Sequence, residues 1–130
     1  MNASVWKSRL GLGLATASLS LVAFASAEAA PLTGDPAAGR IAYQACMGCH
    51  AIDDNDVGPK HRGVVGRKAG SVPGYNYSAA LKTSGIVWTP EMLDRWLQGP
   101  QKLVPGAKMY FSIANAKTRA DIIAYLATQK

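Results

Sequence analysis

Five consecutive residues, Cys46-Met47-Gly48-Cys49-His50, have the types and the spacing to hold an iron porphyrin. Two thiols three positions apart can each form a thioether with a haem vinyl group, and the histidine that follows can supply one axial nitrogen to the iron. The spacing C-x-x-C-H is the attachment signal of a c-type haem. The motif therefore predicts one covalent haem c, attached through Cys46 and Cys49 with His50 as an axial ligand of the iron.

Two other uses of these side chains remain open from the spacing alone. His61, the only other histidine, could be a second axial ligand or could complete a zinc site with the motif. Four zinc ligands must converge, and a histidine directly after a cysteine makes that geometry strained. A thioredoxin-like redox pair lacks the βαβ pattern that should surround it. We expect His61 to be a surface residue.

A second axial ligand has to come from the opposite side of the iron, and the chain has four methionines. Met47 lies inside the motif on the side of His50. Met92 recurs at helical spacing with Leu93 and Trp96, which is typical of a core position. Met109 follows a Pro-Gly turn, so a loop can bring its thioether across. A pair formed by His50 and Met109 would raise the reduction potential and leave no open iron site.

Several donors and acceptors are placed to support such a haem. The carbonyl of Pro59 can accept a hydrogen bond from His50 Nδ1, which would set the tautomer of the ligand. Arg67 and Tyr77 can donate to a haem propionate, and Trp88 can donate its indole N–H to the other. Ordinary surface positions for Arg67 and Tyr77, and a simple core position for Trp88, are the alternatives.

The elements that must position these residues are helical. Asp35-Pro36 predicts a helix that runs to about Cys46, with Ile41 and Tyr43 near its apolar side and Gly39 allowing close approach of another backbone. Further helices are predicted from the caps and stops of three later segments: Ser78 to Lys82, Thr89 to Gly99, and from a Thr118 cap onward. No β-alternation of any length appears. The acidic run 53–56 lacks the glycine and glutamate of a calcium loop and is expected to be a solvated turn.

Residues 1–29 have the pattern of a secretory signal peptide. Lys7 and Arg9 precede an uncharged stretch, and A-x-A sites predict cleavage after Ala27 or Ala29. An uncleaved membrane anchor is the alternative, although the stretch is weakly apolar for a span. The remaining residues, 30–130, form one domain. The net charge of +6 is modest and its basic residues are scattered, which argues against nucleic-acid binding.

The chain resembles the class I cytochrome c family, especially the bacterial cytochrome c2 and mitochondrial cytochrome c group. The resemblance covers 34–130 and rests on separated elements in order: Gly34-Asp35 with Gly39 and Tyr43, CMGCH, Gly58-Pro59, GRKAG at 66–70, PGYNY at 73–77, GIVW at 85–88, PGAKM at 105–109 and RADIIAYL at 119–126. It implies an all-α fold with three main helices, shorter helices and loops around one covalent haem. It also implies His50 and Met109 as axial ligands, Pro59, Arg67, Tyr77 and Trp88 around the haem, and Phe111 beside its edge.

The resemblance further implies a function. A monomeric periplasmic carrier would pass single electrons between membrane complexes, such as a bc1 complex and an oxidase or a photosynthetic reaction centre. A dedicated partner of one periplasmic dehydrogenase has the same sequence features. A haem peroxidase would need an open iron position and a distal acid–base residue.

The chain also departs from the family pattern. Leu81, Trp96 and Ala107 stand where the mitochondrial proteins have a polar, water-holding network beside the methionine, so we expect a drier methionine side that holds Met109 to high pH. The lysines around the haem edge are few, with Lys102, Lys108 and Lys117 retained and uncharged residues at 101, 115 and 116. Docking should therefore depend less on salt than in the mitochondrial proteins.

Overall fold

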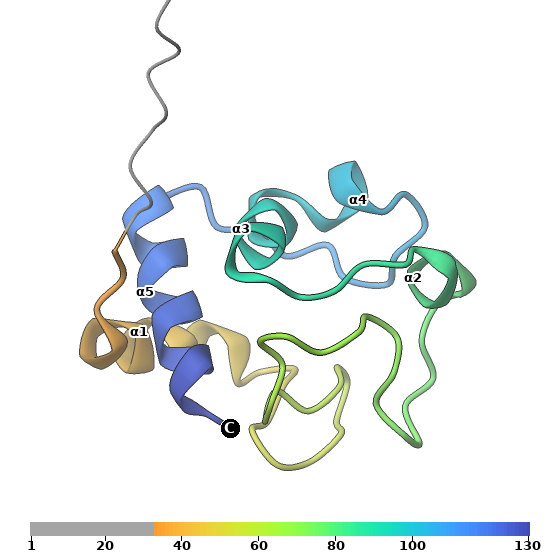
Figure 1. Ribbon diagram of the computed structural model, residues 1–130, viewed down its shortest axis with the longest axis horizontal. Helices are drawn as coiled ribbons and strands as arrows, with labels where there is room; N and C mark the ends of the chain where they lie inside the picture. The colour runs from red at the N-terminus through yellow and green to blue at the C-terminus, as the bar shows by residue number, and fades with distance from the viewer. Residues whose placement is uncertain (1–32) are drawn as a thin grey trace, which may run out of the picture.

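The computed structural model describes residues 33–130, so the predicted leader and its cleavage sites at Ala27 and Ala29 lie outside the described residues. Within 33–130 the chain is helical, and its β structure is limited to one isolated bridge between Lys68 and Val87 (Figure 1). The all-α prediction is confirmed. The elements are α1 (Pro36–Ala42), the 3-10 helix η1 (Tyr43–Cys46), α2 (Ala79–Thr83), α3 (Pro90–Gln98), α4 (Pro100–Leu103) and α5 (Ala116–Thr128).

Side chains cap the helices at the positions that the sequence predicts for α1, α2 and α3. Asp35, Ser78 and Thr89 each accept a hydrogen bond from a backbone N–H in the first turn, at 2.8, 3.2 and 3.2 Å. Each cap satisfies a donor that the helix itself cannot. Proline at the first helical position of α1 and α3 reinforces the start, because its missing N–H costs nothing there.

One predicted helix boundary is wrong, and the structure refines two others in detail. The last helix begins at Ala116 with Asn115 as its cap, and Thr118 donates to Asn115 instead of capping. Asparagine caps a helix as well as threonine does, so the earlier residue takes the role. The first helix narrows to 3-10 geometry after Ala42, which is common at helix ends. Pro100 ends α3 as predicted but also starts the short helix α4.

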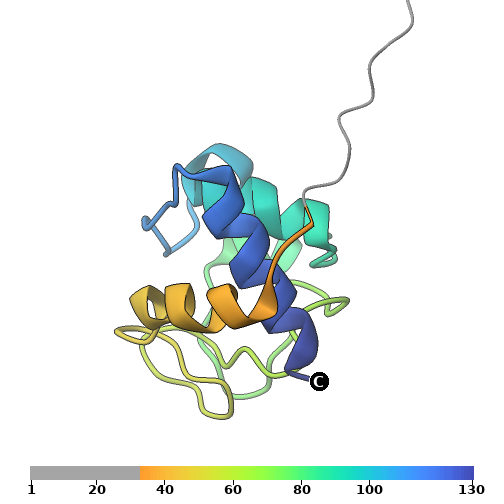
Figure 2. The ribbon, with the colours of Figure 1, turned by 90° about the vertical axis from the view of Figure 1, so that its left-hand side faces the viewer.

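Helices α1 and α5 cross at close range, as Figure 2 shows. A Cβ built on Gly39 would lie 1.9 Å from the carbonyl oxygen of Asp121 and 2.9 Å from the Cβ of Tyr125. Gly34 meets Ala120 in the same way. The backbones can approach this closely only because both positions lack a side chain. The close approach predicted at Gly39 is therefore confirmed.

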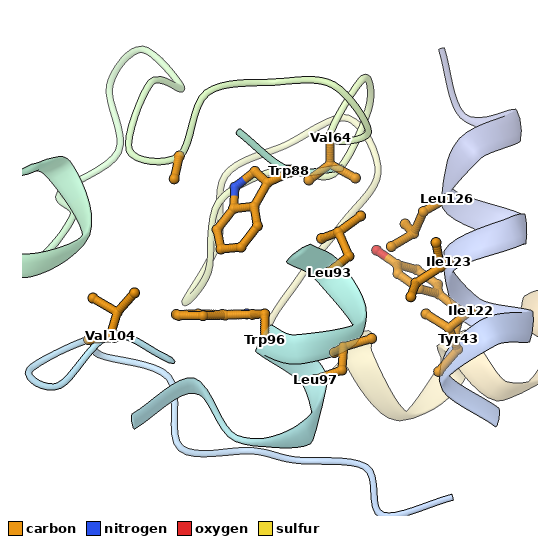
Figure 3. Close-up of a cluster of buried hydrophobic side chains, with 12 residues drawn as sticks. Tyr43, Val64, Trp88, Leu93, Trp96, Leu97, Val104, Ile122, Ile123 and Leu126 are labelled. Carbon is orange, nitrogen blue, oxygen red and sulfur yellow. The ribbon is translucent and has the colours of Figure 1, made fainter. Parts of the chain in front are cut away.

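Tyr43 and the apolar face of α5 form one end of the core (Figure 3). Tyr43 and Ile122 are almost fully buried, at 3% and 1% exposure. Ile41 is exposed, contrary to prediction, because two residues along a helix of 3.6 residues per turn point to nearly opposite sides. Only one of Ile41 and Tyr43 can face α5, and the residue one turn after Gly39 does so.

An ion pair between the buried Arg119 and the partly exposed Asp94 joins α3 to α5. Arg119 Nε donates to Asp94 at 2.7 Å, and its Nη1 donates to the carbonyls of Ile113 and Ala114 at 2.9 and 2.8 Å. A buried guanidinium is tolerated because these acceptors replace its water. The pair anchors the segment that leads into α5.

None of the helices in 33–130 has both the length and the apolar character needed to cross a membrane.

Candidate functional site

One cavity of about 460 Å³ lies between η1, α3, α5 and the long loops. Its size falls within the range of about 300–1,000 Å³ typical of ligand and cofactor clefts. All nine residues predicted for the haem site line it: Cys46, Cys49, His50, Pro59, Arg67, Tyr77, Trp88, Met109 and Phe111. The structure thus brings together residues that the sequence spreads over more than sixty positions. Their individual roles toward a haem stay predictions.

The imidazole of His50 is fixed from two sides. The hydrogen bond predicted to Pro59 is confirmed, with Nδ1 and the carbonyl oxygen 2.8 Å apart. A carbonyl oxygen can only accept, so Nδ1 carries the hydrogen. Gly58 lies flat against the ring, since a Cβ there would come within 2.1 Å of it. Burial lowers the pKa of His50, which favours the neutral ring with a lone pair on Nε2. That lone pair is what a metal ion requires.

His61 is not the surface residue that we expected. Its ring stacks on that of His50, with centroids 4.0 Å apart and planes inclined by 20°, and it lines the cavity. A hydrogen bond of 2.9 Å joins its Nδ1 to the hydroxyl of Tyr43. Burial, with His50 and Arg67 nearby, lowers the pKa of His61 to about 3, so the ring is neutral at neutral pH. Sequence reasoning missed this contact because no local pattern links positions 43 and 61.

The two cysteines lie on one wall of the cavity, on η1 and the turn that follows it. The turn is closed by hydrogen bonds from the backbone N–H groups of Cys49 and His50 to the carbonyl of Cys46. Both thiols are free, and burial raises the pKa of Cys46 to about 11. Within 33–130, no three His, Cys, Asp or Glu side chains gather as they would around a metal ion.

Met109 reaches the cavity from the loop after α4. It is half-buried and packs against the core, whereas Met92 packs against the core without lining the cavity. The neighbouring Lys108 donates its Nζ to the carbonyl of Asn76 at 2.6 Å, which ties this loop to the loop before α2. Gln101 donates to the Met109 carbonyl at 2.9 Å. The sequence indicated Gln101 only as an uncharged position and missed this contact.

The predicted propionate donors have different surroundings. Arg67 donates to the carbonyls of Lys60 and Arg62, both at 2.9 Å, so part of its guanidinium serves the loop itself. The hydroxyl of Tyr77 accepts from the N–H of Val72 at 3.4 Å and keeps its own hydrogen to donate. Burial raises the pKa of Tyr77. The indole N–H of Trp88 makes no hydrogen bond to another residue in 33–130, and its ring is buried and borders the cavity. No fully buried side-chain nitrogen or oxygen in this part of the chain lacks a partner, so the indole nitrogen keeps some accessible surface.

The remaining wall is largely apolar. Trp88 and Trp96 pack edge to face, with centroids 5.2 Å apart (Figure 3). Leu81 and Trp96 line the cavity, and Ala107 is buried in the turn that precedes Met109. At the mouth, the exposed side chains of Val57, Tyr110 and Phe111 form an apolar rim.

These features fit a haem. An apolar cavity offers the surface that a flat ring needs, and two thiols, an imidazole and a thioether line it. The indole N–H of Trp88 and the hydroxyl hydrogen of Tyr77 are donors without a protein acceptor, as carboxylates would require. The apolar lining and the donors on Trp88 and Tyr77 lie outside the C-x-x-C-H motif, so they support the cofactor independently.

Comparisons with known proteins agree with this site. The Cytochrome c family profile matches residues 36–130. Cytochrome c2 of Rhodomicrobium vannielii is 46% identical over 120 residues, which is 89% of this chain and 94% of that protein. Cytochrome c2 of Rhodopila globiformis is 50% identical over 101 residues, 75% of this chain and 95% of that protein. The solved structure of cytochrome cH from Methylobacterium extorquens is 49% identical with a TM-score of 0.71, covering 73% of this chain and 99% of that one. The chain therefore belongs to the cytochrome c family, and it is a monohaem electron carrier that binds one covalent haem c.

Proposed function

We propose that this chain carries single electrons in the periplasm, with the haem iron held by His50 on one side and by Met109 on the other. The observation that carries the proposal is that both side chains line one cavity together with Cys46 and Cys49. Filling both axial positions leaves no site for a substrate on the iron, so we infer a carrier and not an enzyme.

The haem, when bound, supplies a one-electron couple, and the residues of this chain set its surroundings. His50 presents a neutral Nε2 because Pro59 accepts the hydrogen on Nδ1. Cys46 and Cys49 would form the thioether links. Arg67, Tyr77 and Trp88 line the cavity and would donate hydrogen bonds to the propionates, and the apolar wall around Trp96 would keep water out. Exclusion of water favours a high reduction potential, because the more highly charged oxidised form loses solvation.

The mouth of the cavity is the place where partners would receive the electron. Phe111 and Tyr110 are 47% and 77% exposed there, beside Lys108. An apolar rim with a few basic residues suits brief contact with acidic surfaces of a bc1 complex, an oxidase or a reaction centre.

We assign residues 1–29 to a signal peptide and 30–130 to the mature domain. N-terminal sequencing of the purified protein would show a start at Glu28 or Ala30, and a start at Met1 would favour a membrane anchor.

Two variants test the axial ligands. Met109→Ala should abolish the thioether-to-iron charge-transfer band of the ferric protein and let carbon monoxide bind readily to the ferrous protein. Met92→Ala is the matched control, because Met92 packs against the core but does not line the cavity. It should keep the band. A band that survives in Met109→Ala, or rapid carbon monoxide binding by the unaltered protein, would contradict the proposed ligation and favour a peroxidase.

A further inference from the structure

The segment that carries Met109 is held in an unusual way. Within the part of the chain that the structure describes, residues 108–112 make no backbone–backbone hydrogen bond. The turn before them has one, from the N–H of Ala107 to the carbonyl of Val104, and the next is from Ile113 to Leu97. Side chains therefore have to tie this segment to the rest of the fold.

Gln101 on α4 provides the tie at Met109 itself. Its Nε2 donates to the carbonyls of Ala107 and Met109, at 2.6 and 2.9 Å. Its Oε1 accepts from the N–H of Gly106 at 3.3 Å. Both amide hydrogens and the amide oxygen are used. The opposite orientation of the amide would set its oxygen against two carbonyl oxygens, so the pattern of acceptors decides how the side chain points.

The helix beneath Gln101 is a firm support. Pro100 is almost fully buried, and the N–H of Val104 closes the helix onto the carbonyl of Pro100 at 2.8 Å. Gln101 is itself only half-exposed. Its amide thus links this helix to the backbone of Met109, whose side chain lines the same cavity as His50.

We propose that Gln101 is a positioning residue for Met109, and that its three hydrogen bonds set how rarely the methionine segment opens away from the haem iron. The inference rests on the proposed ligation by Met109. Without the amide, the backbone of Met109 has no hydrogen bond to the rest of the described chain, and the thioether must hold the segment by its bond to iron and its packing. Opening would then expose the iron to outside ligands.

The test is ligand exchange in the ferric holoprotein at fixed neutral pH. At saturating imidazole, the rate of Met109 displacement equals the rate at which the segment opens, and stopped-flow loss of the thioether band measures it. Gln101→Met keeps the length and volume of the side chain but removes every hydrogen bond. Loss of two or three neutral hydrogen bonds should raise the saturating rate by about 10- to 100-fold.

Two controls separate this role from a general loss of stability. Gln44→Met places the same substitution at an exposed position on η1 where the structure shows no side-chain hydrogen bond, and its exchange rate should match that of the unaltered protein. Hydrogen exchange of the Gly106 amide, followed by NMR, should accelerate in Gln101→Met but not in Gln44→Met. A variant that is merely less stable would speed amide exchange throughout the protein.

Each outcome bears on one of the two proposals. An imidazole rate in Gln101→Met within twofold of the unaltered protein, with the thioether band present in both, would overturn the role of Gln101 and leave the ligation by Met109 standing. Absence of the band in the unaltered protein would overturn the ligation and, with it, this inference. Faster imidazole exchange together with selective acceleration at Gly106 is the result that we expect.

Discussion

The crossing of α1 and α5 gives the sharpest test of how this fold is held together. Replacing Gly39 by alanine adds one methyl group in the middle of α1, where alanine is favoured over glycine by about 1 kcal/mol in an isolated helix. The crossing opposes this gain. The new Cβ would lie 1.9 Å from the carbonyl oxygen of Asp121, and backbone cannot swing aside as a side chain can. The two helices have to separate, which typically costs about 1–3 kcal/mol for one extra methylene and here should exceed the propensity gain.

Guanidinium unfolding of the holoprotein, followed by far-ultraviolet circular dichroism, measures the outcome. We expect Gly39→Ala to lower the free energy of unfolding by about 1–2 kcal/mol, which is an overpacking cost of about 2–3 kcal/mol less the propensity gain of about 1 kcal/mol. The melting temperature should drop by about 4–8 °C for each kcal/mol in a domain of this size. Gly48→Ala is the matched control, since a Cβ at Gly48 meets nothing within 4 Å and its φ is not positive. It should change stability little. A Gly39→Ala protein as stable as the original would show that the crossing is soft, and would refute the reasoning.

Three further predictions concern acid, water and salt. The backbone N–H of Asp35, 2.7 Å from the Asp121 carboxylate, and the Lys117 ammonium lower the pKa of Asp121 from its ordinary value of 3.8. The ionised carboxylate therefore contributes fully to stability above pH 3.8, and this contribution is lost as the pH falls through the lowered pKa of the folded protein. Unfolding of Asp121→Asn should therefore vary less between about pH 5 and pH 2, and an unchanged acid slope would contradict this. Leu81→Asn should lower the pH at which the ferric thioether band is lost, because a polar side chain brings water to the methionine side; an unchanged midpoint counts against a dry site. Electron transfer to an acidic partner protein should slow only gently with ionic strength in stopped-flow measurements, and a steep fall would contradict the sparse lysine ring.

Predictions that depended on short-range chemistry were accurate. Asp35 and Thr89 each cap a helix by accepting a hydrogen bond from a backbone N–H within the next three residues. The hydrogen bond between His50 and Pro59 joins residues that are nine positions apart in one loop. The close approach at Gly39 followed from one missing side chain at helical spacing from Tyr43. In each case the physical cause and its signal lie in the same short segment.

Contacts between distant segments were harder to predict. His61 was expected at the surface because one histidine in a glycine-rich loop has no periodicity, and its partners Tyr43 and His50 come from η1 and the turn after it. The sequence pattern indicates Gln101 only as an uncharged position. Its amide donates to the carbonyl of Ala107 and accepts from the N–H of Gly106, and these hydrogen bonds form only where the turn at Gly106 lies close to α4. The residue types allow these hydrogen bonds, but only the three-dimensional path of the chain shows which residues meet.

The two sides of the haem site are therefore built differently. His50 belongs to a turn whose backbone is hydrogen-bonded, and its ring is held by Pro59, by the backbone of Gly58 and by the stacked ring of His61. Met109 belongs to a segment that has only side-chain ties, each worth about 1 kcal/mol. Any opening of the site must then begin on the methionine side, since fewer and weaker contacts have to break there. It follows that substitutions around Gln101 should change ligand exchange, whereas substitutions around His61 should change the orientation of the imidazole without freeing it.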